Sequence, residues 1–319
     1  MFYFLHKNTL LQWLILIMLA CFVTFKLITH PILQLPEGAP FLYHSIYSSL
    51  STNSALFVVV IGCILVLQII LLQIYFLRNH FLGKFSLLPA IFYLGLLSCD
   101  SFLAPVTPAF FSNLCAVIVL NLIHDYTPQS VKSRALLAGI ITGIGICIDL
   151  ASAILMVFII TSFVMNLFSK IKNILISIIG LITSFIYVIT YFFLTDKLPV
   201  LLENLREIRF LHFFNCLPSF SPISTISFSI IISILLYIIV KIALRYKNKL
   251  VILRKKVLTL NVFFINSFLA IFFTLLSYPS FFQYLFLPLA VYLTLFTQER
   301  NRFFLNEITF LILIVALCL

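Results

Sequence analysis

Three acidic residues, Glu37, Asp100 and Asp149, lie in short polar stretches between long apolar runs, and these are the side chains best placed to do chemistry. Carboxylates that gather at the rim of a cavity can bind a metal ion, act as a general base or hold a cationic group. Asp100 is the strongest candidate, because Pro105 and Pro108 follow it and prevent the chain from continuing as one helix. For each acid the simpler interpretation, a solvent-exposed carboxylate at a helix end, stays open.

Histidines add a second type of candidate ligand. His30 and His44 fall in the same polar stretch as Glu37, and His212 lies farther along the chain. Three histidines and a carboxylate on one face can form a metal site, and His44 is the histidine that we keep as a candidate. Nothing in the spacing requires a metal, so the presence of a divalent cofactor stays open.

The seven cysteines show no CxxC motif and no close spacing to histidine, and most fall inside apolar runs. We expect them to be small buried hydrophobic residues, neither metal ligands nor a disulfide framework.

The composition identifies the class of protein that must position these side chains. Hydrophobic residues make up 63% of the 319 residues and charged residues only 9%. In soluble domains roughly a quarter of residues are charged. The sequence therefore predicts an all-α integral membrane protein, a polytopic bundle of helices in a lipid bilayer. The net charge of +11 comes from basic residues between apolar runs, which is typical of membrane topology and not of nucleic-acid binding.

Eleven apolar runs are predicted to cross a bilayer of about 30 Å. They are residues 10–29, 55–77, 85–99, 106–123, 135–149, 151–168, 173–194, 223–244, 258–276, 281–297 and 303–319. The run from 135 to 168 is divided in two, because a single straight helix of that length would be about 50 Å long. Gly143 and Gly145 weaken the helix, and an undivided span would place Asp149 at mid-bilayer.

The basic stretch from Arg245 to Val257 sets the predicted orientation, because Lys and Arg beside membrane spans are held on the cytoplasmic side. With the N-terminus inside and eleven spans, this loop and most other basic clusters face the cytoplasm and the C-terminus lies outside. Ten spans would place the later clusters on the wrong side. This orientation puts Glu37, Asp100 and Asp149 on the outer face.

Two predicted outer segments do not span the membrane. The first, His30 to Ser54, ends in a Ser- and Tyr-rich piece that can form a short surface helix. In the second, residues 196–222, Pro199 opens a helical pattern that continues to about residue 214, with its leucines on one face and its charges away from it. This second helix is predicted to lie at the membrane surface, either as a plain connector or as a lid over a cavity.

Three segments carry a resemblance to known proteins: PEGAPFLYHSIYSSL (36–50), LLPAIFYLGLLSCDSFLAPVTPAFFSNLCAVIVL (87–120) and LLAGIITGIGICIDLASAIL (136–155). Their order resembles the C-type glycosyltransferases, multi-pass enzymes that use polyprenyl-phosphate sugars, and looks closer still to a family of multi-pass bacterial membrane proteins of unknown function. The resemblance implies Glu37 and Asp100 as the catalytic acids, a polyprenyl-phosphate lipid as a partner, and the bacterial inner membrane as the location. It covers residues 1–195 of one membrane domain, which continues through the outer loop at 196–222 to the C-terminal spans at 223–319.

The leading hypothesis is therefore a glycosyltransferase-like protein that handles a polyprenyl-linked sugar at the outer leaflet. One alternative is a non-catalytic subunit or scaffold of an envelope complex, which would bind other membrane proteins. Another is a transporter, which requires a mid-membrane cavity near Asp149 faced by Asn113, Asn121 and Thr142. No internal repeat of the kind found in transporters is visible.

Overall fold

The chain folds into helices throughout the part that the structure describes. A computed structural model describes residues 9–29, 41–51, 54–79, 86–98, 108–124, 131–165, 171–196, 198–199, 237–238, 240–242, 244, 251–274 and 283–297. Every regular element within these ranges is helical, which confirms the all-α class for this part of the chain.

The helices follow the predicted spans closely. They are α2 (Thr9–Thr29), α3 (Phe41–Ser51), α4 (Ser54–Asn79), α5 (Leu88–Ser98), α6 (Pro108–His124), α7 (Val131–Ile148), η3 (Leu150–Ala153), α8 (Ile154–Met165), α9 (Ile171–Leu194), α12 (Val251–Thr274) and α13 (Gln283–Thr297). Of these, three are long and apolar enough to cross a membrane, at Leu56–Asn79, Val131–Ile148 and Ile171–Leu194. The length and apolar composition of these helices indicate a membrane protein.

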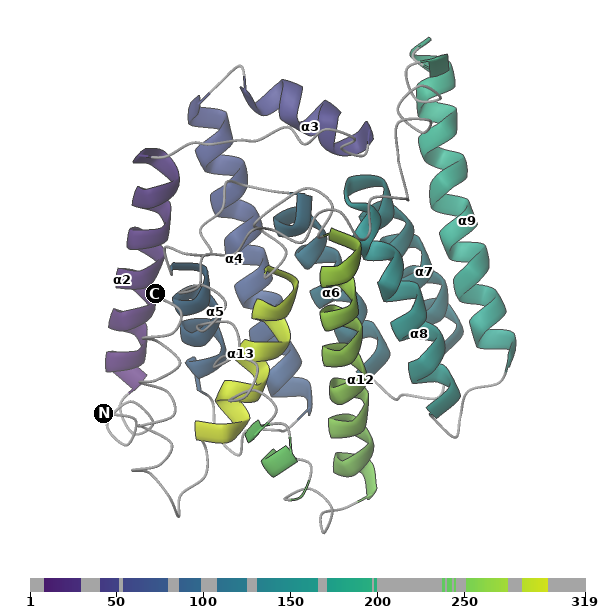
Figure 1. The fold of residues 1–319 in the computed structure, drawn as a ribbon. Helices are drawn as coiled ribbons and strands as arrows, with labels where there is room; N and C mark the ends of the chain where they lie inside the picture. The colour runs from purple at the N-terminus through teal and green to yellow at the C-terminus, as the bar shows by residue number, and fades with distance from the viewer. Residues whose placement is uncertain are drawn as a thin grey trace.

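Some predictions fall outside the described ranges. The span at 303–319, most of the span at 223–244 and nearly all of the surface helix near 199–214 lie there. Eleven crossings, with the N-terminus inside and the C-terminus outside, stay a prediction. The short helix expected in the Ser- and Tyr-rich piece is confirmed as α3, which lies across one end of the bundle (Figure 1).

The long helices from α2 to α9 run in alternating directions along the chain, so that helices next but one in the sequence, such as α7 and α9, pack side by side in parallel (Figure 1). At the end opposite α3, Gln12 near the start of α2 accepts a hydrogen bond from the backbone N–H of Leu87, just before α5, at 2.9 Å. Gln73 of α4 donates its side-chain amide to the carbonyl of Ser86 at 2.6 Å. These bonds fix the position of the start of α5 along the helix axes of α2 and α4.

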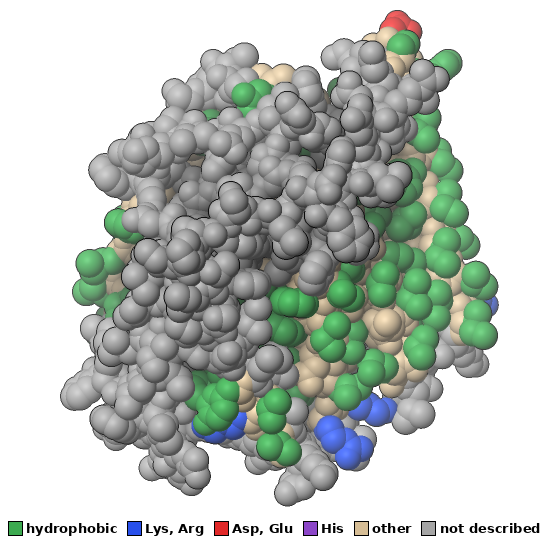
Figure 2. All heavy atoms as spheres, in the orientation of Figure 1, with side chains coloured by type: hydrophobic (Ala, Val, Ile, Leu, Met, Phe, Trp, Pro, Cys, Tyr) green, Lys and Arg blue, Asp and Glu red, His purple; other side chains and the backbone are tan. Residues whose placement is uncertain are grey.

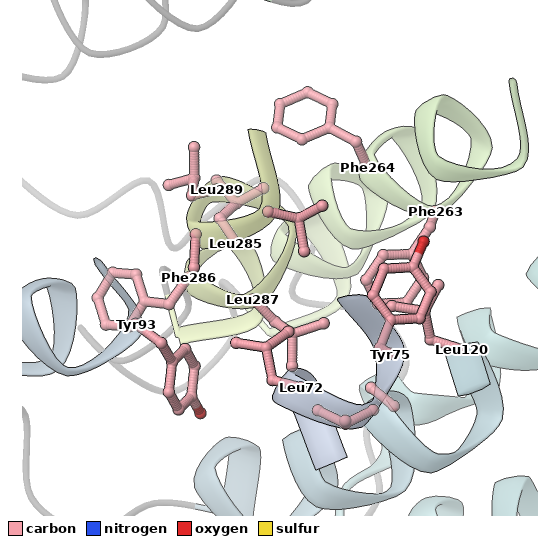
Figure 3. Packing of buried hydrophobic residues seen from close by; sticks show 14 of the residues in the cluster. Leu72, Tyr75, Tyr93, Leu120, Phe263, Phe264, Leu285, Phe286, Leu287 and Leu289 are labelled. Carbon is pink, nitrogen blue, oxygen red and sulfur yellow. The ribbon is translucent and has the colours of Figure 1, made fainter. Parts of the chain in front are cut away.

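The largest hydrophobic core joins α4, α5, α6, α12 and α13. In Figure 3, Leu72 of α4 and Tyr93 of α5 lie beside the side chains of α13, while Leu120 of α6 lies near Phe263 of α12. Phe263 of α12 also contacts α8, where its ring meets Phe158 in an edge-to-face arrangement with 5.0 Å between ring centroids. The core lies between the outermost helices, α2 on one side and α9 on the other (Figure 1).

Small residues determine how α9 packs against α7. The buried face of α9 carries Ser177, Gly180 and Ser184, while its opposite face exposes large apolar side chains. A Cβ atom added to Gly139 of α7 would lie 2.0 Å from the carbonyl oxygen of Ser177, and one added to Gly180 would lie 2.3 Å from that of Leu136. Because lipid solvates apolar side chains well, close backbone packing of small residues is what holds such a helix pair together.

Two sequence predictions were wrong in part. The basic stretch to Val257 was interpreted as a loop, but α12 already begins at Val251, and the hydroxyl of Thr259 bonds back to the carbonyl of Lys255 at 3.0 Å. Among the described cysteines, Cys115 is buried as expected, whereas Cys21 and Cys63 are exposed on the outer faces of their helices. On a membrane protein such positions can face lipid, which solvates a thiol side chain as well as a protein core does.

Candidate functional site

The apolar run from residue 135 to 168 breaks at Asp149, as predicted. Helix α7 ends at Ile148, Asp149 adopts an extended conformation with φ −148° and ψ 122°, and the short helix η3 follows. The Asp149 side chain accepts a hydrogen bond through Oδ1 from the backbone N–H of Ala151 at 3.2 Å. Aspartate is favoured at this position because its carboxylate satisfies a backbone N–H that the next helix leaves unpaired.

The second oxygen of the Asp149 carboxylate binds a residue far along the chain. The hydroxyl of Tyr284, in the first turn of α13, donates a hydrogen bond to Asp149 Oδ2. The Tyr284 hydroxyl oxygen also lies 2.6 Å from Ser112 Oγ, in the second turn of α6. One chain of three side chains thus joins the start of α6, the end of α7 and the start of α13.

Mostly small residues surround these three hydrogen-bonded side chains and allow the helices to approach one another closely. Tyr284 packs with Ala109, Ala151, Ile154 and Ala270 in a separate buried cluster. The cluster brings together α6, η3, α8, α12 and α13. The carboxylate therefore lies in a tightly packed part of the protein and is only half-exposed.

A further hydroxyl group adjoins the chain. Ser152 of η3 is fully buried, and its Oγ atom forms no hydrogen bond with any residue that the structure describes. A Cβ atom placed on Gly145 would lie 3.3 Å from Ser152 Oγ and 3.4 Å from the Cβ of Cys115, so α6, α7 and η3 meet here. The Ser152 hydroxyl lies beside Tyr284 and is available to it as a second hydrogen-bonding group.

No described basic side chain balances the charge of Asp149. Neither a lysine nor an arginine in the described ranges forms an ion pair with it, and the visible Lys and Arg atoms lie toward the end of the molecule opposite α3 (Figure 2). On α7 itself, Arg134 lies about four helical turns away, roughly 22 Å along the axis. A charged carboxylate inside a membrane protein is costly, which makes it a functional candidate by default.

The other predicted site residues are not placed. Glu37, Asp100, His30 and His212 lie outside the described residues, and although His44 falls in α3, its side chain is not described. Within the described residues no group of three or more His, Cys, Asp or Glu side chains gathers to hold a metal ion. A shared site of Glu37, Asp100 and Asp149 therefore stays a prediction.

Sequence reasoning missed Tyr284 and Ser112. Tyr284 is 135 residues from Asp149 and Ser112 is 172 residues from Tyr284, so no local pattern links the three. The available signal was modest: each residue is a polar side chain close to the start of an otherwise apolar helix.

A second polar cluster lies at the opposite end of the bundle. His124 Nε2 is 3.0 Å from the carbonyl oxygen of Lys256 and 3.3 Å from the hydroxyl of Tyr75. Because a carbonyl oxygen only accepts, Nε2 carries the hydrogen and donates it to Lys256. The Lys256 ammonium group in turn donates to the carbonyl of Asn79, the last residue of α4, at 3.4 Å. This cluster ties together α4, α6 and α12.

Two of the three polar residues that a transporter would need form hydrogen bonds to the backbone. The Thr142 hydroxyl donates to the carbonyl of Ala138 in its own helix at 2.8 Å. The Asn121 amide donates to the carbonyl of Leu71 on α4 at 3.1 Å and to that of Val117 at 3.0 Å.

Comparisons with models of protein families, with curated proteins and with solved structures find no match to this chain.

Proposed function

We propose that this chain is a multi-pass enzyme of the bacterial inner membrane that handles a polyprenyl-linked sugar at the outer leaflet, in the manner of a C-type glycosyltransferase. The observation that supports it best is the half-buried carboxylate of Asp149, held by Tyr284 with no described basic partner. A carboxylate packed among the helices of a membrane protein without a basic partner is retained at a cost in stability, and chemistry is a common reason for retaining it.

The geometry suits a proton acceptor. The hydrogen bonds from Tyr284 and from the N–H of Ala151 fix both carboxylate oxygens of Asp149, so the side chain cannot rotate away from an approaching hydroxyl group. A positioned carboxylate can remove a proton from a sugar hydroxyl as that oxygen attacks the donor. Under the predicted orientation, this carboxylate faces the leaflet in which a polyprenyl donor would present its sugar.

Glu37 and Asp100 complete the proposed site. Asp100 precedes the start of α6 at Pro108, and Ser112, one turn into α6, contacts Tyr284. Glu37 precedes α3, whose buried Tyr43 packs edge-to-face on Phe111 of α6 with 6.0 Å between ring centroids. Both acids are therefore joined in sequence to helices that meet at the Asp149 end of the bundle.

The test uses the full-length protein in lipid nanodiscs with a long-chain polyprenyl-phosphate hexose as the probe. We expect the protein to bind this lipid and to release or transfer its hexose. Asp149→Asn, Asp100→Asn and Glu37→Gln should each lower turnover at least tenfold, since a positioned general base contributes about 10²-fold or more. Asp196→Asn is the matched control, because Asp196 is an exposed acid at the end of α9 and should leave turnover unchanged.

Two results would overturn the proposal. The first is absence of both lipid binding and hexose release in the wild-type protein. The second is a stoichiometric partner that co-purifies with the chain and keeps its full cellular function when Glu37 and Asp100 are both replaced by alanine. That result would favour the non-catalytic subunit.

A further inference from the structure

The chain from Asp149 through Tyr284 to Ser112 has two complete hydrogen-bonding patterns. Ser112 Oγ lies 2.6 Å from the Tyr284 hydroxyl oxygen, and either atom can be the donor. The same Ser112 Oγ lies 3.2 Å from the carbonyl oxygen of Ala109, which can only accept. The serine hydrogen therefore has two possible acceptors.

In the first pattern Asp149 is ionised. Its Oδ2 accepts the hydrogen of Tyr284, and the Tyr284 oxygen accepts the hydrogen of Ser112. In the second pattern Asp149 Oδ2 carries a proton, and the resulting carboxyl O–H donates a hydrogen bond to the Tyr284 oxygen. Tyr284 then donates to Ser112 Oγ, and Ser112 turns its hydrogen to the carbonyl of Ala109. No heavy atom has to move between the two patterns.

Every O–H donor of Asp149, Tyr284 and Ser112 has an acceptor in both patterns. This matters because an unpaired buried donor costs about 1–3 kcal/mol, which would otherwise strongly favour one protonation state. The buried Ser152 hydroxyl, which forms no hydrogen bond with a described residue, adds a second acceptor beside Tyr284 for the pattern in which Tyr284 donates away from Asp149.

Among the residues that the structure describes, no basic side chain forms an ion pair with Asp149. The other titratable groups described around it are Tyr284 from α13, Cys115 from α6 and Cys147 from α7, none of which carries a positive charge, while Ala270 of α12 and the residues of η3 do not titrate. A buried carboxylate without a basic partner lowers its energy by taking up a proton. The oxygen atoms are already in hydrogen-bonding contact with one another, which fits a proton better than a metal ion.

We infer that Asp149, Tyr284 and Ser112 form a proton-binding site, which takes up one proton from water and releases it by reversing the direction of its hydrogen-bond chain. On uptake an O–H bond forms at Asp149 Oδ2, and the hydrogens of Tyr284 and Ser112 each turn to the next acceptor. The half-exposed carboxylate is the group that exchanges the proton. The inference goes beyond the proposed function, because the site binds its proton without a sugar or a lipid substrate.

Infrared spectroscopy of the full-length protein in lipid vesicles tests this directly. The C=O stretch of a protonated carboxyl group is followed as the pH is changed, with no substrate present. We expect a titrating band that disappears in Asp149→Asn and persists in Asp196→Asn. Hydrogen–deuterium exchange of the solvent should shift this band, as it does for a carboxyl group that exchanges its proton with water.

Two further variants test the reversal itself by moving the titration midpoint in opposite directions. Tyr284→Phe removes the donor to the ionised carboxylate, and the midpoint should rise by about one pH unit or more. Ser112→Ala combined with Ser152→Ala removes the acceptors that Tyr284 needs when Asp149 is protonated, and the midpoint should fall by about one unit. A role in packing alone would change the unfolding temperature of these variants without moving their midpoints in opposite directions.

The inference is overturned by a titrating band that survives Asp149→Asn. It is also overturned if the titration midpoint moves in the same direction in Tyr284→Phe and in the Ser112→Ala, Ser152→Ala double variant. Should Asp149→Asn fail to fold, judged by its helical circular dichroism, the opposite shifts still decide the question. Failure of the proposed function gives a different result, namely an intact titration without hexose release.

Discussion

Alanine at Gly139 would place a methyl group on α7 where the backbone of α9 already lies. The added Cβ atom would be 2.0 Å from the carbonyl oxygen of Ser177 and 2.8 Å from its carbonyl carbon. Neither atom can rotate away, because both belong to the backbone of a continuous helix. We therefore predict that Gly139→Ala separates α7 from α9.

The size of the effect follows from this distance. A carbon atom and a carbonyl oxygen need about 3.3 Å between them, so the two helices must move apart by roughly 1 Å. Such overpacking typically costs about 1–3 kcal/mol, while alanine in a helix gains about 1 kcal/mol over glycine. We expect a net loss of up to about 2 kcal/mol in the free energy of unfolding, and a similar loss for Gly180→Ala, where Leu136 O lies 2.3 Å away.

The chain supplies controls of two kinds. A Cβ atom on Gly62 or Gly95 would meet nothing within 4 Å, so alanine there should be neutral or stabilising. At Gly143 the nearest atom is Ser184 Oγ, at 1.8 Å, which belongs to a side chain and can rotate. Gly143→Ala should therefore cost less than Gly139→Ala, and Ser184→Ala should restore most of the loss.

The assay is reversible unfolding in mixed micelles by titration with a denaturing detergent, followed by circular dichroism. The prediction concerns the order of stabilities: Gly62→Ala highest, then Gly143→Ala, then Gly139→Ala and Gly180→Ala. Equal stability of Gly139→Ala and Gly62→Ala would refute the close contact between α7 and α9.

Three other outcomes are expected. Tyr93→Phe removes the hydroxyl that donates to Gln68 Oε1 at 2.8 Å, and should lower the free energy of unfolding by about 1–2 kcal/mol; an unchanged value would show that the amide finds another donor. A lipid-soluble photoactivated carbene reagent, which does not need an ionised thiol, should label Cys63 and leave Cys115 unlabelled in the folded protein, so equal labelling would contradict the burial of Cys115. Tags at the two ends of the chain should be accessible from opposite sides of the membrane, and accessibility from one side only would exclude an odd number of crossings.

Helix positions were predictable because lipid demands long apolar runs. The break at Asp149 was predictable for the same reason, since a single helix from 135 to 168 would be too long and would bury a charge. The start of α12 at Val251 was missed, because hydropathy measures burial in lipid and a helix can extend beyond the membrane with basic residues such as the exposed Arg254. Helix propensity was compatible with this extension, since Lys and Arg are good helix formers, but propensity alone does not locate the first residue of a helix.

The partner of Asp149 could not be predicted. In a soluble protein an amphipathic pattern shows which helix face is buried, but a membrane helix is apolar all round and its contact face is marked only by scattered polar or small residues. Tyr284 is one of 13 tyrosines, and nothing in its neighbourhood distinguishes it from those that face lipid. Only the three-dimensional arrangement brings the starts of α6 and α13 to the end of α7.

Helix α6 explains why this arrangement is fixed. Ser112 near its start bonds to Tyr284, and His124 at its end bonds to Lys256 of α12, about 18 Å away along the helix axis. A helix held by directional bonds at both ends can neither rotate nor slide without breaking one of them. Any shift that moved Tyr284 from Asp149 would therefore also strain the cluster at the other end. The position of the Asp149 carboxylate thus depends on residues across the whole length of the bundle, including those far from the site itself.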